Sequence, residues 1–199
     1  MSESNPDVID SLAGVATGSR LDAIRAQRPQ ARENAQKSHL ALFEPKFPGA
    51  VSAEERYGIA TFVAGLHGDK TILAFYREAL ANLGGRPELV AAVDDEIARG
   101  GAAGPYGRYP AGPLSAEDKA GPILRVADAN RRVLGARLAA ALEHAHLLIF
   151  RPRDASPAAL QSLVDAGWST TDIVTLSQLI AFLSFQIRAV VGLRALAAA

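Results

Sequence analysis

The chain has 199 residues, 49% of them hydrophobic and 21% charged, which suits one ordinary globular domain with its own core. Its 21 lysines and arginines equal its 21 aspartates and glutamates, so it lacks the broad positive field that nucleic-acid binding normally requires. It contains no cysteine, which excludes disulfides and thiolate metal sites.

The first seven residues are polar and acidic, and they lack the basic and then apolar pattern of a secretory signal, which favours a cytoplasmic location. The most membrane-like run, residues 173–193, contains Gln178, Gln186 and Arg188. A charged residue at that depth of a bilayer is costly. We therefore interpret this run as a buried helix and expect no membrane partner.

The N-terminal part is predicted to be helical at residues 8–15 and 21–43, with Pro29 as a break or a first-turn residue. We assign these helices to an N-terminal helical cover, residues 1–48. A connector with two prolines and a glycine leads from it into the larger helical domain, residues 49–199, and the whole is expected to form one compact unit.

Residues 52–80 are predicted to form two amphipathic helices that meet at a glycine-rich break, residues 65–69. Apolar residues recur at helical spacings on both sides of this break. Asp69 stands where the second helix should begin, so its side chain can accept hydrogen bonds from free backbone N–H groups and its charge is favoured by the helix dipole. The residues expected to face inward are Ile59, Val63, Leu66, Ile72, Tyr76, Leu80 and Leu83.

A third helix is predicted to begin at Pro87 and to stop before a long loop at residues 100–113, which holds too many glycines and prolines for regular structure. Loops of this length are uncommon in compact domains unless they have a use. Tyr106, Arg108 and Tyr109 could cover a pocket or contact another subunit, and a disordered surface excursion is the alternative.

A long helix is predicted at residues 121–150, with Ile123 among its inward residues, and a shorter one follows at residues 157–166. His144 and His146 are two residues apart on the long helix, so they point about 200° away from each other. They cannot bind one metal ion together, and the sequence predicts no metal site.

The last helix, predicted to run to about residue 197, is apolar on nearly every side and must be central or lie between subunits. The exception is one line of small and polar residues, Ser177, Ala181, Ser184 and Arg188. An arginine is rarely buried without a partner, so Arg188 should face a carboxylate, backbone carbonyls or an anionic ligand. Every periodic segment of the chain has a helical spacing, which predicts an all-α fold with about seven to nine helices.

The helix pair around Asp69 resembles the catalytic helix pair of the AhpD-like, or carboxymuconolactone decarboxylase, superfamily, whose peroxidase members carry Cys-x-x-Cys-x-x-x-His at the start of the second helix. Laid on without gaps, the two cysteines fall on Asp69 and Ile72, the histidine on Tyr76, and an upstream glutamate near Tyr57. Residues 160–188 are similar to the C-terminal part of the peroxidase-related members. The resemblance implies an AhpD-like helical fold, and because this chain has no cysteine it implies a protein without thiol peroxidase activity.

One function hypothesis follows from the decarboxylase members of the superfamily: a non-redox enzyme that acts on a small carboxylated or unsaturated molecule. In this hypothesis Glu55 and His67 would transfer protons. Asp69 would act at the helix start, Tyr76 would donate a hydrogen bond, and Arg188 would bind a substrate carboxylate. No cofactor is required.

The other hypothesis is a non-catalytic ligand-binding protein or partner subunit that retains the fold. Glu55 also suits a carboxylate that stabilises its helix start, His67 an exposed loop histidine, and Tyr76 a core residue. An enclosed pocket in which Glu55, His67 or Asp69 converges on Tyr76 would favour catalysis, whereas a filled core would favour a structural role. In both hypotheses we expect a homo-oligomer, most simply a dimer, with a trimer or a hexamer as the alternatives that relatives use.

Overall fold

The computed structural model describes residues 6–84 and 86–198, and every regular element in these ranges is a helix apart from one isolated antiparallel bridge between Gly107 and Lys119. The all-α prediction is confirmed, and so is the expected number of helices, with nine α-helices in the described ranges. The elements are α1 (Val8–Ala13), α2 (Arg20–Ala26), α3 (Pro29–Phe43), α4 (Ala53–His67), α5 (Lys70–Asn82), α6 (Pro87–Gly100), the 3-10 helix η1 (Pro113–Glu117), α7 (Asp128–Phe150), the 3-10 helix η2 (Pro152–Asp154), α8 (Pro157–Asp165) and α9 (Thr170–Ala198).

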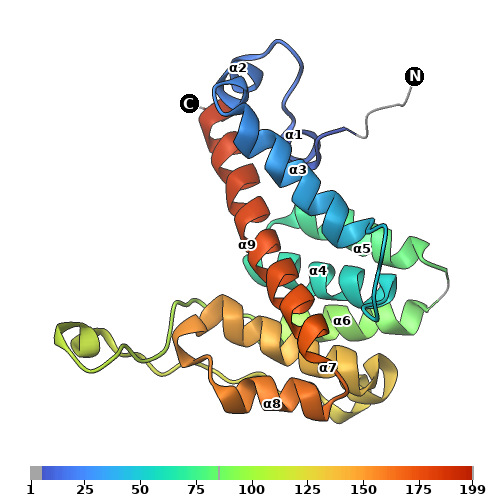
Figure 1. The fold of residues 1–199 in the computed structure, drawn as a ribbon, viewed down its shortest axis with the longest axis vertical. Helices are drawn as coiled ribbons and strands as arrows, with labels where there is room; N and C mark the ends of the chain where they lie inside the picture. Colours follow the sequence, from blue (N-terminus) through green and yellow to red (C-terminus); the bar gives the residue numbers. More distant parts are fainter. Residues whose placement is uncertain (1–5, 85, 199) are drawn as a thin grey trace.

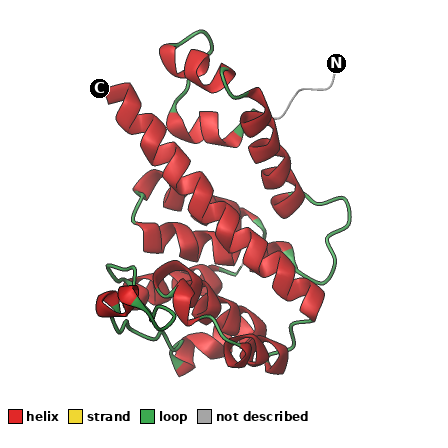
Figure 2. Ribbon diagram, turned by 60° about the vertical axis from the view of Figure 1, so that its left-hand side comes forward, coloured by secondary structure: helices red, strands yellow, loops and turns green. Residues whose placement is uncertain are grey.

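Helix α4 forms the centre of the fold, since α5, α6, α7 and α9 all pack against it. The long helix α9 crosses the molecule from α7 and α8 at one end to α1, α2 and α3 at the other (Figure 1, Figure 2). Of the two places predicted for the last helix, central or between subunits, the fold shows the central one, and a subunit contact stays a prediction. The N-terminal cover packs along the C-terminal half of α9 (Figure 1).

The helix ends follow the local signals of the sequence. At the start of α4, Ser52 and Glu55 form a reciprocal capping box. Gly68 then ends α4 in the left-handed conformation, with φ of 78°, and Asp69 caps α5. Ser156 caps α8 in the same way. The helix pair predicted around the glycine-rich break is confirmed. It was predictable because each of these signals acts within three or four residues.

The long helix predicted to begin at Gly121 begins instead at Asp128, so the predicted start is wrong. The intervening segment, residues 121–127, has no regular secondary structure and lies against α6 and α7; we call it the strap. Two of its backbone N–H groups donate to the carboxylates of Glu143 and Glu96, each at 2.9 Å. These acceptors lie far along the chain, so the strap satisfies its backbone without forming a helix.

Two residues predicted to face inward are exposed. Ile123 lies on the strap and is 63% exposed, because the helix that would have turned it inward does not form there. Leu83 is the C-cap residue of α5 and is 45% exposed, because it lies at the very end of the helix, past Leu80, the last buried residue of α5.

The segment between α6 and the strap, residues 101–120, forms an arm that projects from the helical body (the green projection in Figure 1). The predicted loop occupies its outgoing half and η1 its tip. The ammonium of Lys119 lies 5.2 Å from the centroid of the Tyr106 ring, and the guanidinium of Arg153 lies 3.9 Å from that of Tyr109. These cation–π contacts hold the base of the arm and fix it to η2.

By length and composition alone, α7 and α9 are long and apolar enough to cross a membrane. In the fold, however, 61% of the apolar stretch of α7 and 44% of that of α9 are buried against other helices. Core helices of soluble proteins commonly have this composition, so the property carries little weight on its own.

Candidate functional site

The break between α4 and α5 places Asp69 at the start of α5, as predicted. Its Oδ1 accepts hydrogen bonds from the backbone N–H groups of Thr71 and Ile72, at 3.1 and 2.9 Å. Its Oδ2 pairs with the guanidinium of Arg194 on α9 at 2.8 Å. Both carboxylate oxygens are thus engaged. One caps the first turn of α5, and the other links the start of α5 to α9.

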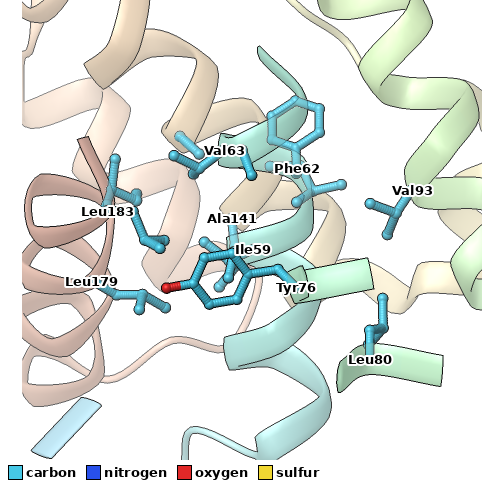
Figure 3. Close-up of a cluster of buried hydrophobic side chains, with 14 of the residues drawn as sticks. Ile59, Phe62, Val63, Tyr76, Leu80, Val93, Ala141, Leu179 and Leu183 are labelled. Atoms are coloured by element: carbon cyan, nitrogen blue, oxygen red, sulfur yellow. The ribbon is translucent and has the colours of Figure 1, made fainter. Parts of the chain in front are cut away.

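The other two positions that the resemblance makes reactive lie in the core. Ile72 and Tyr76 have no exposed surface. Figure 3 shows the Tyr76 ring among Ile59, Leu179 and Leu183, with its hydroxyl directed towards α9, where it donates to Oε1 of Gln186 at 2.5 Å. Burial raises the pKa of Tyr76 well above its ordinary value, so the phenol stays protonated. The core around these positions is filled.

Glu55 lies at the opposite end of α4. Besides closing the capping box with Ser52, it accepts from Nε of Arg137 on α7 at 2.8 Å. The same guanidinium lies 4.4 Å from the centroid of the Trp168 ring, just before α9. Glu55 therefore stabilises the start of α4 and links it to α7, and Arg137 extends this link to Trp168, just before α9. Glu55 lies about 18 Å along the helix from His67, so these two residues do not act on one molecule of substrate size.

His67 is the last residue of α4, and its Nε2 lies 3.3 Å from Oγ of Ser184 on α9. Burial, followed by the positive charge of Arg188, lowers the pKa of His67, so the ring is neutral at neutral pH. Arg188 is exposed and donates to the backbone carbonyl of Ser184 at 3.0 Å, one of the partners predicted for it. The structure thus gathers two of the predicted site residues, His67 and Arg188, on either side of Ser184.

A cleft of about 430 Å³ opens beside this group, and we call it the Arg188 cleft. Its walls come from the end of α7, the middle of α9 and the base of the arm. Most of the lining is apolar, and Ser184 and Arg188 supply its polar groups. The lining residues are Pro105, Leu148, Ile149, Pro152, Ile180, Ala181, Ser184 and Arg188.

A second cleft, of about 300 Å³, lies between the strap, α7 and the start of α8, and we call it the His144 cleft. Sequence reasoning missed it because it treated the strap as the first turns of a helix. One signal was present: Arg151, the residue after α7, is seven residues from His144, a spacing of about two helical turns. On the far side of the strap, His146 lines a separate cleft of about 220 Å³ and lies 3.1 Å from the carbonyl oxygen of Gly100. The two histidines point to different clefts, as their spacing predicted.

No family model, curated protein or solved structure matches this chain. The similarity to the AhpD-like superfamily stays a hypothesis, and function has to be inferred from the two clefts and their side chains. Within residues 6–84 and 86–198, no three histidine, aspartate or glutamate side chains are grouped so that they could hold a metal ion. The Arg188 cleft offers a cation for a carboxylate, and the neutral His67, which is not part of its lining, contacts the Ser184 that lines it.

Proposed function

We propose that the protein is a non-catalytic, ligand-binding member of the AhpD-like superfamily that takes a small carboxylic acid in the Arg188 cleft. The observation that carries this proposal is the filled core at Ile72 and Tyr76, where the peroxidase members would have reactive groups. With Asp69 fully engaged by backbone N–H groups and Arg194, nothing at that position is open to a substrate. The absence of cysteine from the whole sequence fits the same loss of thiol chemistry.

The chemistry of the Arg188 cleft supports a small acid with an apolar body. Leu148, Ile149 and Ile180 give it an apolar wall. The guanidinium of Arg188 is exposed, and it is not paired with any carboxylate of the described residues, so its outer N–H groups can bind a ligand carboxylate. Paired N–H groups of an arginine match a carboxylate in geometry as well as charge.

Sorbate, a small unsaturated carboxylic acid, is a suitable probe. We expect it to bind with a millimolar dissociation constant in calorimetry and to shift the imidazole NMR signals of His67. Arg188→Gln should weaken binding about tenfold, the size of one charge-assisted interaction. Gln178→Ala, on an exposed part of the same helix, is the matched control and should bind as the unmodified protein does. Equal binding of sorbate by the Arg188 variant, or no binding at all, would contradict the proposal.

The contact between His67 and Ser184 favours a second candidate, the non-redox enzyme. A neutral imidazole next to the cleft could take a proton from a carbon of a bound unsaturated acid and return one from solvent. Incubation of sorbate in D₂O would then replace its C–H protons with deuterium, which proton NMR measures directly. His67→Phe should abolish the exchange and Ser184→Ala should slow it. No exchange above the protein-free rate would leave the binding role alone.

We also propose that the protein is a homo-oligomer, most simply a dimer. Helix α9 exposes Val174, Phe185 and Val191, which are 56%, 52% and 47% exposed, and the tip of the arm exposes Leu114. Apolar side chains gathered on one helix, with an arm that projects from the body (Figure 1), are typical of subunit contacts. Light scattering should give at least twice the chain mass of 20.9 kDa. A monomer at micromolar concentrations would contradict this, and Phe185→Asp should dissociate a dimer that uses α9.

A further inference from the structure

The outer side of α9 carries a line of exposed residues at alternating spacings of four and three, and we call this line the α9 seam. Its residues are Val174, Gln178, Ala181, Phe185, Arg188, Gly192 and Ala195. In Figure 2, α9 is the helix that ends at the C label, and it crosses the front of the molecule. The same alternating spacing marks the contact line of paired helices in coiled coils.

The side chains of the seam differ in size in a way that suits an antiparallel pair with a second copy of α9. We place the two-fold axis at Phe185, the middle residue of the seam. Gln178 then faces the partner's Gly192, and likewise Ala181 faces the partner's Arg188. Each long side chain meets a small one, as in closely packed helices. A parallel pair would instead set the two Arg188 side chains, which carry the same charge, directly against each other.

The area of the seam indicates how strong this contact is. Residues 174–195 span about 32 Å along α9, at about 1.5 Å per residue. Two helices packed about 8–10 Å apart would cover a strip about 10 Å wide on each, or about 600 Å² over both chains. A stable interface buries about 1,200–2,000 Å². A stable dimer therefore also needs the surfaces beside the seam, namely the apolar wall of the Arg188 cleft and the arm.

The seam and the Arg188 cleft share two residues, Ala181 and Arg188. In the antiparallel pair the partner's Arg188 would lie against Ala181, at the lining of the cleft. The chain's own Arg188 is seven residues further along α9, or about 10 Å. Each cleft would then be covered by the partner helix and would hold one guanidinium from each copy, whereas a single chain supplies only one.

The charge of Arg188 couples the subunit contact to the ligand. The guanidinium is exposed and is not paired with any carboxylate of the described residues. A dimer would bury it between two helices, close to the same charge of the partner, and a buried charge without a partner is costly. A carboxylate bound in each cleft supplies the missing counter-charge. A ligand that favours the dimer in this way is also bound more tightly by the dimer.

We propose that a second copy of this chain covers the α9 seam in an antiparallel pair, and that its Arg188 completes the Arg188 cleft. A small carboxylic acid bound in the cleft then strengthens the dimer. This inference rests on the proposed function of the cleft and adds its regulation, since the assembly state of the protein responds to the concentration of the acid.

The test is sedimentation equilibrium of the full chain over a dilution series, with and without sorbate, followed by interference optics. We expect saturating sorbate to lower the dissociation constant of the dimer at least about tenfold. Sorbyl alcohol, the neutral analogue, should leave this constant unchanged, and so should sodium chloride at the concentration of the sorbate salt. Arg188→Gln should remove the effect of sorbate without weakening the ligand-free dimer.

Ala181→Glu tests the subunit contact without any ligand. It places a carboxylate opposite the partner's Arg188, so the ligand-free dimer should be at least about tenfold tighter and sorbate should add little. Within one chain, positions 181 and 188 are two turns apart and are not neighbours on the helix surface. Ala81→Glu, at an exposed position on α5, is the matched control and should leave the dimer unchanged. Far-UV circular dichroism shows that each variant is folded.

The outcomes separate this inference from the proposed function. If calorimetry shows that sorbate binds but the dissociation constant of the dimer does not change, the coupling is wrong and the proposed function stands. If sorbate does not bind, the proposed function and the coupling both fail, and a tighter dimer of Ala181→Glu would still support the contact. Equal dissociation constants for Ala181→Glu and Ala81→Glu would overturn the antiparallel contact. A monomer in every variant would do the same, and the seam would then be bare or covered by another protein.

Discussion

The hydrogen bond between Tyr76 and Gln186 provides the sharpest test of whether the position matched to the superfamily's histidine is structural. Tyr76→Phe removes the hydroxyl that donates to Oε1 of Gln186. Nε2 of the same amide already has no partner among the described residues, and Gln186 is fully buried. The variant would therefore leave the whole amide unsatisfied inside the core.

An unsatisfied buried group costs about 1–3 kcal/mol. For a chain of this length, each kcal/mol lowers the melting temperature by about 2–4 °C, so we expect a loss of several degrees. The double variant Tyr76→Phe with Gln186→Leu replaces both polar groups by apolar ones of similar size. It should be nearly as stable as the unmodified protein, so the second change should recover most of the stability that Tyr76→Phe loses.

Urea unfolding followed by far-UV circular dichroism measures all members of this cycle. Tyr57→Phe is the control, because its ring also contacts Phe43, tilted rather than stacked, but is only half-buried, so removal of its hydroxyl should cost less stability. The reasoning is refuted if Tyr76→Phe is as stable as the unmodified protein, or if the two changes are additive. Loss of sorbate exchange in a Tyr76→Phe variant of full stability would instead show a catalytic role.

Three further predictions concern residues outside this pair. Burial lowers the pKa of His39 from 6.5 to about 4, so the unfolded chain binds more protons between these values and stability falls as the pH drops from 6.5 to 4. The loss should be at most about 3 kcal/mol in urea unfolding, and a His39→Leu variant should show a flatter profile. Asp69→Ala should lower the free energy of unfolding by about 1–3 kcal/mol, since it removes a helix cap and an ion pair. Asp69→Asn keeps the cap and should lower it by less than half of that amount. Equal losses of stability in the two variants would contradict the capping role. The combined variant Asp69→Cys, Ile72→Cys and Tyr76→His should show at most weak peroxide consumption with a thiol reductant, because the surrounding groups matter as much as the reactive ones, and activity equal to that of a native peroxidase would refute this.

A structural feature could be predicted from the sequence only where the interaction that produces it acts over a short range along the chain. The helix starts at Ser52 and Asp69 were predictable because the capping residue and the N–H groups it accepts from are two or three residues apart. The inward faces of α4 and α5 were predictable because apolar residues repeat at the helical period. For the candidate site, the sequence supplied His67 and Arg188 as separate candidates, but nothing in it indicated that Ser184 would connect them.

Local signals in the chain were therefore enough to predict that the protein is all α and where most of its helices start. The packing of the helices, in contrast, sets the conformation of the non-helical strap, because its backbone partners Glu96 and Glu143 lie on other segments. It also decided the pairing of Tyr76 with Gln186, which are 110 residues apart in the chain. Local patterns specify which conformation a segment prefers, whereas buried polar groups are satisfied by whichever side chains the packing of the helices brings within reach.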